Sequence, residues 1–302
     1  DDTEYGRGMF YTLEDLSEIV AYAKARNIEI IPEVDLPGHM VAAVASYPEL
    51  SCDPSKKYEV RIDGGISKDV LNVGDDRVID FLKCVLGHVA TVFPYDYVHI
   101  GGDECPTDQW KTNQMCLDRV KELGLDGVHQ LQSWLVEELG IFLKEEYGKD
   151  IIVWDELLAN WNDNNKTKPV IMAWNGMGFS TQAANRGFKS IIVPYQYLYI
   201  DFMQGEEGDL FVDEPYHGGW GVNTVDEIYG LNPLSALSGK EEFALGVQCN
   251  MWTETCNDID EVEYCLLPRM LAVSEIGWLP TDKKDWTSFY LRLQTHDEIF
   301  DH

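Results

Sequence analysis

Residues 97–104 read YVHIGGDE, and the interpretation of the fold depends on this stretch. Val98 and Ile100 are β-branched residues that favour a buried strand. Two glycines then remove the side chains at the strand end, where a ligand or another backbone can come close. The stretch ends in the adjacent carboxylates of Asp103 and Glu104. In a barrel of parallel strands covered by helices, catalytic residues lie at this end of the strands. The alternative for two adjacent carboxylates is an acidic surface turn.

The composition is that of a globular chain with a strongly acidic surface. The 302 residues are 45% hydrophobic and 12% aromatic, which is enough for a core in one or two domains. The 53 acidic residues exceed the 23 basic ones and give a formal net charge of -30. Such a chain repels phosphate backbones and anionic lipid, which argues against nucleic acid and membrane surfaces as partners. No apolar run is long enough for membrane insertion. The seven cysteines show no C-x-x-C spacing.

Short apolar segments alternate with helical patterns along the chain, which predicts parallel βαβ units. Strands are predicted at residues 28–35, 97–100, 151–156, 170–174, 190–194 and 245–252. Helices are predicted at residues 12–26, 75–92, 113–123, 129–147, 181–186, 260–274 and 285–299. The long loop 204–233 is rich in glycine and acidic residues and is predicted to lie over the mouth of a site.

The residues at the strand ends indicate what such a site would bind. A doubly wound sheet binds ligands at one crevice, whereas functional-looking residues after nearly every strand favour a barrel. Trp154, Trp174 and Trp252 each end a predicted strand, although any one of them could be a core residue. There is no glycine-rich phosphate loop and no nucleophile elbow. Aromatic faces stack on the C–H faces of a sugar and carboxylates bind its hydroxyls, so the residues predict a glycosidase.

The adjacency of the two carboxylates carries mechanistic information. Ordinary retaining and inverting glycosidases place two carboxylates on opposite sides of the scissile bond. Neighbours at one strand end, such as Asp103 and Glu104, are poorly placed for that task. We expect one of them to be an acid whose pKa is raised by burial and by the charge of the other, which stays ionised.

At these residues the chain resembles a known family. The motif HIGGDE at 99–104 is similar to the signature of glycoside hydrolase family 20, the β-N-acetylhexosaminidases. The resemblance extends in order through IPEVDLPGH at 31–39, VWDE at 153–156, YID at 199–201 and WTE at 252–254. It covers essentially the whole chain. It implies an α/β fold of the TIM (β/α)8 barrel type, no cofactor, and a glycan substrate that contains N-acetylhexosamine.

The resemblance also implies substrate-assisted catalysis, an exception to the two-carboxylate rule. The 2-acetamido oxygen of the sugar attacks its own anomeric carbon, and water opens the resulting oxazolinium with retention. Glu104 matches the general acid/base, and Asp103 matches the residue that orients the acetamido N–H. Tyr199 matches the hydroxyl that bonds the acetamido oxygen. His39 matches the histidine that hydrogen-bonds the acid/base.

The remaining matched residues are expected to bind the substrate. Trp154, Trp174 and Trp252 match the aromatic box around the sugar and its acetyl group. Asp201 and Glu254 match the residues that hold sugar hydroxyls. His99 points to the same region, and a direct role for it stays open.

The sequence also departs from the family pattern. The family's first strand carries an arginine that clamps the terminal sugar, and its second strand carries an aspartate that partners the matched histidine; neither is found here. We therefore expect residues 1–302 to be one catalytic barrel domain that runs from about the third strand to the eighth helix and lacks the N-terminal part. Open sheet edges would then allow self-association. The resemblance favours an exported protein, periplasmic or extracellular.

Two other interpretations remain at this point. One is a catalytically impaired, sugar-binding fragment of such an enzyme. The other is a metal-dependent barrel hydrolase with His39, His99, Asp103 and Glu104 as ligands.

Overall fold

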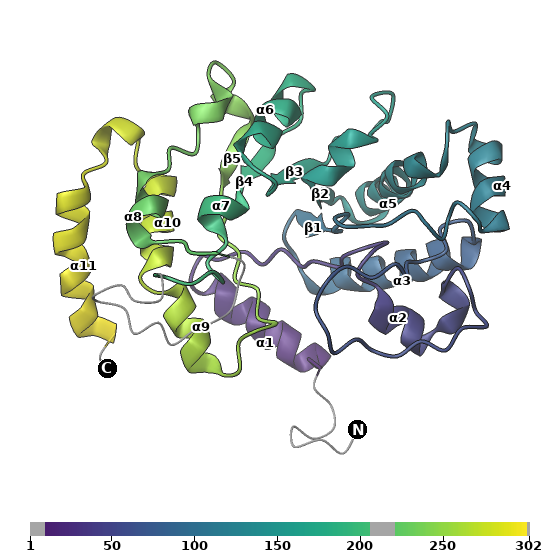
Figure 1. Cartoon of the computed structure of the whole chain (residues 1–302), viewed down its shortest axis with the longest axis horizontal. Helices are drawn as coiled ribbons and strands as arrows, with labels where there is room; N and C mark the ends of the chain where they lie inside the picture. The colour runs from purple at the N-terminus through teal and green to yellow at the C-terminus, as the bar shows by residue number, and fades with distance from the viewer. Residues whose placement is uncertain (1–9, 206–220, 301–302) are drawn as a thin grey trace. The chain divides into compact units, whose positions relative to one another are not determined.

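The computed structural model describes residues 10–205 and 221–300, with side chains to residue 296 (Figure 1). The chain divides into two compact units, Asp1–Val170 and Ile171–His302. Each unit contains parallel strands and the helices that connect them. No helix among the described residues is long and apolar enough to cross a membrane.

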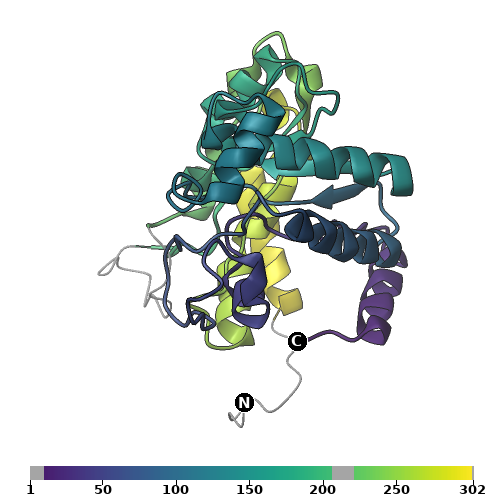
Figure 2. The ribbon, with the colours of Figure 1, turned by 90° about the vertical axis from the view of Figure 1, so that its right-hand side faces the viewer.

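The first unit is built on two parallel strands, β1 (Tyr97–His99) and β2 (Asp150–Trp154). Helices α3 and α5 pack side by side (Figure 2). The helices begin and end at residues with suitable capping chemistry. Thr12 and Asp15 form a reciprocal capping box at the start of α1, as the sequence predicts. Glycines in the left-handed conformation end α4 and α5. The helices of this unit are α1 (Leu13–Lys24), α2 (Val41–Ser46), α3 (Asp76–Val92), α4 (Gln114–Leu123) and α5 (Leu131–Tyr147), with short 3-10 turns η1 (Pro48–Leu50), η2 (Val128–Gln130) and η3 (Asp155–Ala159).

The predicted strand 28–35 is not a regular strand. Only a single parallel bridge forms, between Glu33 and His99. The neighbouring backbone still follows β1, because His99 N–H donates to the Pro32 carbonyl (2.9 Å) and Val34 N–H donates to the His99 carbonyl (3.0 Å). Pro32 has no N–H to donate, which shortens any ladder that passes through it. The segment therefore delivers its polar residues to the end of β1 as the sequence predicts, but as an extended chain.

The second unit contains the parallel strands β3 (Val170–Ala173), β4 (Ser190–Ile192) and β5 (Ala244–Val247) in the order β3-β4-β5. The predicted strand 245–252 is shorter than expected. A register shift at Ser190/Ile191 interrupts the β4–β5 ladder, and past β5 only a bridge between Asn250 and Tyr199 continues the pairing. This bridge aligns the two segments that follow the strands.

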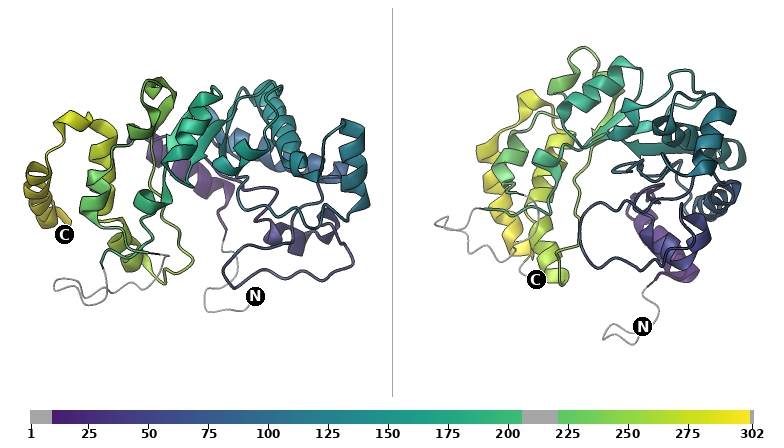
Figure 3. Two further views of the ribbon diagram at one scale, coloured as in Figure 1. Left: turned by 45° about the horizontal axis from the view of Figure 1, so that its top comes forward. Right: turned by 45° about the vertical axis from the view of Figure 1, so that its right-hand side comes forward.

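The helices of the second unit are shown from two further sides in Figure 3. Helices α8 and α10 pack on each other. The single predicted helix 260–274 is wrong: it is two helices, because Pro268 follows α9 and cannot continue its hydrogen bonding. The helices are α6 (Met177–Asn185), α7 (Tyr195–Leu198), α8 (Val225–Gly230), α9 (Ile259–Leu266), α10 (Arg269–Trp278) and α11 (Trp286–Phe300), with 3-10 turns η4 (Ser235–Leu237), η5 (Glu241–Phe243) and η6 (Thr281–Lys283). Residues 206–220 of the predicted loop over the site lie outside the described residues.

Candidate active site

Four titratable side chains meet beyond the C-terminal end of β1 in the first unit, and we call Asp35, His39, Asp103 and Glu104 the acid cluster. His39 Nε2 lies 3.4 Å from Asp103 Oδ2 and 3.5 Å from Glu104 Oε2. One oxygen each of Asp35 and Asp103 and a nitrogen of His39 lie within 4.8 Å of one another. The structure therefore brings together the three cluster residues that the sequence predicts, and it adds Asp35.

The backbone at this strand end is shaped to let the acid cluster form. Gly101 has φ +68, and a Cβ atom there would lie 1.7 Å from Asp35 Oδ1, so no other residue fits without displacing that carboxyl. Gly102 N–H donates to Asp35 Oδ1 at 3.0 Å. Glu104 and His39 also adopt positive φ, 45° and 51°, which is uncommon for residues other than glycine. Such conformations occur preferentially at functional sites.

Asp35 and Asp103 share a proton. Their carboxyl groups are hydrogen-bonded to each other, which requires one of them to be protonated. Burial, followed by the charge of Asp103, raises the pKa of Asp35 to about 9. Burial alone would raise the pKa of Asp103, but its hydrogen bonds to His39 and Asp35 hold that pKa below its usual value. Asp35 is therefore the proton donor of the pair, and Asp103 stays ionised.

Glu104 and His39 complete the charge arrangement. Burial and the nearby charge of Asp103 raise the pKa of Glu104, which favours its protonated form. The hydrogen bond to Asp103 is the largest cause that raises the pKa of His39 to about 9, so the imidazole is a cation near neutral pH. The pKa values of two adjacent carboxyl groups are thus shifted in opposite directions, a pattern typical of acid–base catalysis.

His99 and Trp154 lie together with Glu33. Glu33 Oε1 accepts a hydrogen bond from Trp154 Nε1 (3.0 Å) and lies 3.2 Å from His99 Nδ1. The His99 ring contacts the Trp154 indole with centroids 4.8 Å apart. Both side chains are buried. His99 Nε2 has no hydrogen-bond partner among the described residues. The geometry makes His99 a positioning residue for Trp154. It does not place His99 with the possible metal ligands Asp35, His39 and Asp103.

In the second unit, aromatic side chains gather after β3, β4 and β5, and we call Trp174, Tyr195, Tyr199 and Trp252 the aromatic group. Trp174 stacks on Tyr199 with centroids 6.0 Å apart and an interplanar angle of 17°. Trp252 approaches the same tyrosine ring at 6.1 Å. Trp174 and Tyr199 are half-buried and Trp252 is exposed. The structure thus brings together the three second-unit aromatic residues predicted for the site and adds Tyr195.

Two predicted carboxylates accompany the aromatic group. Asp201 is 5% exposed, and its Oδ1 atom has no hydrogen-bond partner among the described residues. Burial raises the pKa of Asp201 to about 6, and the charge of Glu254 acts in the same direction. Glu254 itself is exposed. A buried carboxylate oxygen without a donor is expensive unless a ligand supplies one.

Arg269, which the sequence reasoning missed, fixes the segment that carries Tyr199 and Asp201. Its guanidinium is fully buried at the start of α10. It donates to the carbonyl oxygens of Ile200 (2.6 Å) and Phe202 (2.7 Å), on the two sides of Asp201. A planar, permanently charged fork suits such a set of fixed acceptors. No spacing or pattern in the sequence pointed to this contact.

The cluster atoms could also coordinate a cation. Asp35, His39 and Asp103 are the one group of at least three such ligands close enough for this among the described residues. Hydrogen bonds already join these three groups, and the His39 cation compensates the Asp103 charge. The arrangement therefore fits proton transfer, because metal ligands would have to give up the shared proton and the imidazolium proton.

Comparisons with known proteins identify the family of the chain. The family model "Glycosyl hydrolase family 20, catalytic domain" matches residues 1–281. A β-hexosaminidase of Porphyromonas gingivalis is 38% identical over 296 residues, which are 97% of this chain and 37% of that protein. A β-hexosaminidase of Vibrio furnissii is 33% identical over 273 residues, 89% of this chain and 44% of that protein. The chain thus spans less than half the length of these two relatives.

Solved structures give the same result for the fold. A GH20 exo-β-N-acetylglucosaminidase from Vibrio harveyi superposes with a TM-score of 0.85 at 29% identity, covering 97% of this chain and 45% of that one. A β-N-acetylhexosaminidase from Bacteroides fragilis gives a TM-score of 0.81 at 26% identity, covering 99% of this chain and 59% of that one. The fold class is therefore α/β of the TIM-barrel type, as predicted. The chain belongs to glycosyl hydrolase family 20.

Proposed function

We propose that this chain carries the catalytic machinery for hydrolysis of terminal, non-reducing N-acetyl-β-D-hexosamine residues of glycans, by substrate-assisted catalysis with retention. The observation that supports this most strongly is the division of labour at one strand end. The pKa of Asp103 is lowered, while burial and the charge of Asp103 raise the pKa of its neighbour Glu104. A glycosidase with its two carboxyl groups on one side of the scissile bond has to take its nucleophile from elsewhere, and the 2-acetamido oxygen of the substrate can supply it.

In the proposed reaction Glu104 gives its proton to the glycosidic oxygen as the bond to the anomeric carbon breaks. The acetamido oxygen attacks that carbon, and the positive charge passes to the oxazolinium ring. Asp103 accepts the acetamido N–H and stabilises this charge, while the proton of Asp35 and the His39 cation hold it in place. Water then attacks the anomeric carbon and gives its proton to the Glu104 carboxylate, which restores the acid.

The aromatic group and its carboxylates supply the binding contacts in this proposal. The Tyr199 hydroxyl would bond the acetamido oxygen, and Trp174 and Trp252 would stack on the sugar and its acetyl group. Trp154, whose indole N–H donates to Glu33 and whose ring contacts His99, would also stack on the substrate. Asp201 and Glu254 would accept sugar hydroxyls. The buried Asp201 Oδ1 atom has no hydrogen-bond partner in the part of the chain that the structure describes, which supports this role because a sugar hydroxyl would supply the donor.

A substrate pair tests the proposal. An aryl N-acetyl-β-D-glucosaminide and the matching aryl β-D-glucoside differ only in the 2-acetamido group. They should be assayed with the chain itself and with a fusion that adds the preceding residues of the Porphyromonas gingivalis relative. We expect that at least the fusion hydrolyses the acetamido substrate and that neither form hydrolyses the glucoside. Turnover of both sugars at similar rates would contradict the proposal, as would an inactive but cooperatively folded fusion.

Inhibitors distinguish the mechanism from that of an ordinary retaining glycosidase. A thiazoline analogue of the oxazolinium should bind far more tightly than the substrate because it resembles the intermediate. Asp103→Asn and Tyr199→Phe should both slow hydrolysis of the acetamido substrate. A fluorosugar trapped covalently on any carboxylate would instead identify a protein nucleophile.

We also propose that the chain can self-associate through its apolar extended segments. Ile28 and Ile31 precede the Glu33 bridge and are 56% and 38% exposed, and Leu245 on β5 is 45% exposed. Exposed backbone edges beside apolar side chains favour pairing with another chain. Light scattering after size exclusion should show dimers or larger species that Ile31→Lys reduces. A monodisperse monomer at micromolar concentration would contradict this proposal.

A further inference from the structure

A pair of thiols lies outside the acid cluster, where the segment after η1 meets the first turn of α4. Cys52 follows η1, and Cys116 is the third residue of α4. Their thiols reach the adjacent residues Leu71 and Asn72, and each thiol shifts the pKa of the other. Cys52 is half-buried and Cys116 is fully buried. A small reagent can therefore reach Cys52, while Cys116 lies behind it.

The surrounding polar groups tie the backbones of the two cysteines together. The Asn113 side chain bonds to both backbones: its Nδ2 donates to the Cys52 carbonyl (3.0 Å), and its Oδ1 accepts from Cys116 N–H (3.1 Å). The Cys116 thiol donates to Asn72 Oδ1 at 3.2 Å, and the Cys52 thiol lies 4.0 Å from the Leu71 carbonyl. One asparagine thus ties the two backbones together, and a second orients the inner thiol.

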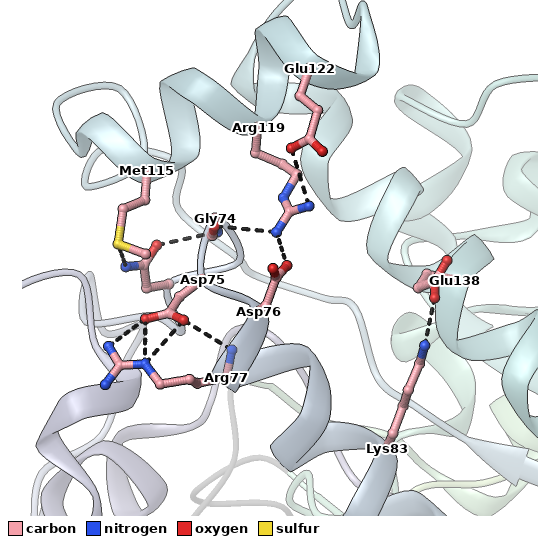
Figure 4. A network of polar contacts seen from close by, with 10 residues as sticks. Gly74, Asp75, Asp76, Arg77, Lys83, Met115, Arg119, Glu122 and Glu138 are labelled. Atoms are coloured by element: carbon pink, nitrogen blue, oxygen red, sulfur yellow. Dashed lines mark hydrogen bonds and ion pairs between the residues drawn. The ribbon is translucent and has the colours of Figure 1, made fainter.

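The start of α4 is also attached firmly to the segment that precedes α3 (Figure 4). Arg119 donates to the Gly74 carbonyl (3.4 Å) and pairs with Asp76. Gly74 sits so close to α4 that a Cβ atom there would lie 2.3 Å from the Met115 carbonyl carbon. The backbone around Cys116 therefore has little freedom to move away from Cys52.

The chemistry of the pair favours reaction between these two thiols. The hydrogen bond from Cys52, a backbone bond from Gly74 and the charge of Arg119 lower the pKa of Cys116. A thiolate is the form that attacks a disulfide. Burial raises the pKa of Cys105 to about 12, and the neighbouring Cys116 is the largest cause that raises the pKa of Cys52. Of these three thiols, Cys116 is therefore the one whose thiolate is favoured.

We propose that Cys52 and Cys116 form a reversible intramolecular disulfide, which makes this part of the first unit sensitive to redox conditions. With a small organic disulfide as oxidant, one thiol of the pair attacks and releases one small thiol. The other thiol of the pair then attacks the protein sulfur of this mixed disulfide and releases the second. Two protein thiols and one small disulfide become one protein disulfide and two small thiols, so protons and electrons balance.

The proposed bond would cross-link the chain around the catalytic strand end. Cys52 and Cys116 are 64 positions apart (116 minus 52), and β1 and Glu104 lie between them. A disulfide that closes a loop of this size restricts the unfolded chain and stabilises the folded one. We expect the Tm of the oxidised protein to exceed that of the reduced protein by roughly 5–15 °C.

Peptide mapping tests the proposal directly. The chain is equilibrated with oxidised glutathione or with dithiothreitol, free thiols are alkylated under denaturing conditions, and the digest is analysed by mass spectrometry. We expect a linked peptide pair containing Cys52 and Cys116 in the oxidised sample, and its loss after reduction. Alkylated Cys52 and Cys116 in the oxidised sample, or a link of either to another cysteine, would overturn the proposal.

Variants connect the bond to stability. Cys52→Ser and Cys116→Ser should each abolish the oxidation-dependent rise in Tm, whereas Cys84→Ser, at an exposed site on α3, should keep it. The same rise in Cys52→Ser would show that another bond causes it and would contradict the proposal. The mapping result on the unmodified chain decides the matter even where a variant folds poorly. The inference does not depend on the proposed glycosidase function, because neither readout measures activity.

Discussion

The acid cluster and the carboxylates beside the aromatic group differ in how the charge of a buried carboxyl group is compensated. In the acid cluster the protein itself supplies the partners: Asp35 bonds to Asp103, and His39 lies between Asp103 and Glu104. Asp103 Oδ1 and Asp201 Oδ1 are both buried without a hydrogen-bond partner among the described residues, but the pKa of Asp103 is lowered whereas that of Asp201 is raised to about 6. Asp103 is thus stabilised as an anion before any ligand arrives, and Asp201 is not.

This difference assigns the acid cluster to the chemical step and the residues around Asp201 to substrate binding. Groups that stabilise developing charge act most strongly when the fold holds them in place beforehand. Groups that recognise a substrate have to exchange water for ligand, so an open acceptor among aromatic faces suits them. Changes in the acid cluster should therefore lower kcat, whereas changes around Asp201 should mainly raise KM. The following effects are expected in whichever form, the chain itself or the fusion, hydrolyses the N-acetyl-β-D-glucosaminide.

Replacing the acid should produce the largest effect. Glu104→Gln keeps the shape of the side chain but removes the proton that the leaving group needs. General acid catalysis contributes roughly 10²–10⁴-fold, so kcat for an N-acetylglucosaminide with a poor leaving group should fall by about that factor. Glu59→Gln, at a side chain that is 73% exposed, is the matched control and should leave kcat unchanged. A Glu104→Gln enzyme within a few-fold of the parent would remove Glu104 from the acid/base role.

The next effect tests whether the acid cluster depends on close approach of the backbone. Gly101→Ala would place a methyl group 1.7 Å from Asp35 Oδ1 and force Asp35 away from Asp103. A displacement of about 1 Å can lower catalysis by about 10²-fold, and we expect a loss of that order in kcat.

Gly148→Ala is a control with the same backbone strain. Gly148 has φ +71, close to the +68 of Gly101, but no atom lies within 4 Å of the added methyl group. Comparable losses of activity in the two variants would show that strain, and not the Asp35 contact, is responsible.

The sequence predicted most members of the acid cluster but not the contacts between them. Asp103, Glu104 and His39 were recognisable because each belongs to a short motif at a strand end. Asp35 stands in the motif EVDLPGH, but nothing in the sequence shows that Gly101 allows it to contact Asp103. Contacts between segments 66 or more positions apart depend on packing, which periodicity and local propensity do not report.

The same limit explains the errors in the fold. The segment 28–35 has strand-like composition, and the prediction did not allow for the missing donor of Pro32. Pro268 interrupted a helical pattern that the apolar spacing continued across it. Arg269 is the clearest case, because its partners are backbone carbonyl oxygens, which leave no trace in the sequence.

A smaller effect is expected when Asp201 in the second unit is replaced. Asp201→Asn replaces a charged acceptor by a neutral one, and this difference is worth about 1 kcal/mol per hydrogen bond. KM should therefore rise roughly 5- to 10-fold, with a smaller change in kcat. The effect should grow as pH rises through about 6, where Asp201 becomes ionised. Asp282→Asn, at an exposed side chain, is the control. A loss confined to kcat would place Asp201 with the chemistry and break the comparison.

The smallest effect concerns the stability of the acid cluster. The pKa of His39 is about 9 in the folded protein and 6.5 for an ordinary histidine, so the folded state holds the proton more tightly. The stabilisation is complete below about pH 6.5 and is lost as pH rises through about 9. Asp35 acts in the same direction, since its raised pKa favours folding at low pH and this contribution is lost between about 4 and 9. The free energy of unfolding should therefore fall across this window.

His39→Gln isolates the imidazole contribution, because the variant keeps the Asp35–Asp103 pair and lacks only the titrating ring. His39 is partly exposed, so solvent screening limits its contribution to about 1 kcal/mol. Urea unfolding at pH 6, 7, 8 and 9 should show that the variant loses less stability over this range than the parent does. His88→Gln, at an exposed position on α3, should follow the parent curve. Parallel curves for His39→Gln and the parent would mean that His39 is not held as a cation, and that the acid cluster is less complete without a ligand than its geometry indicates.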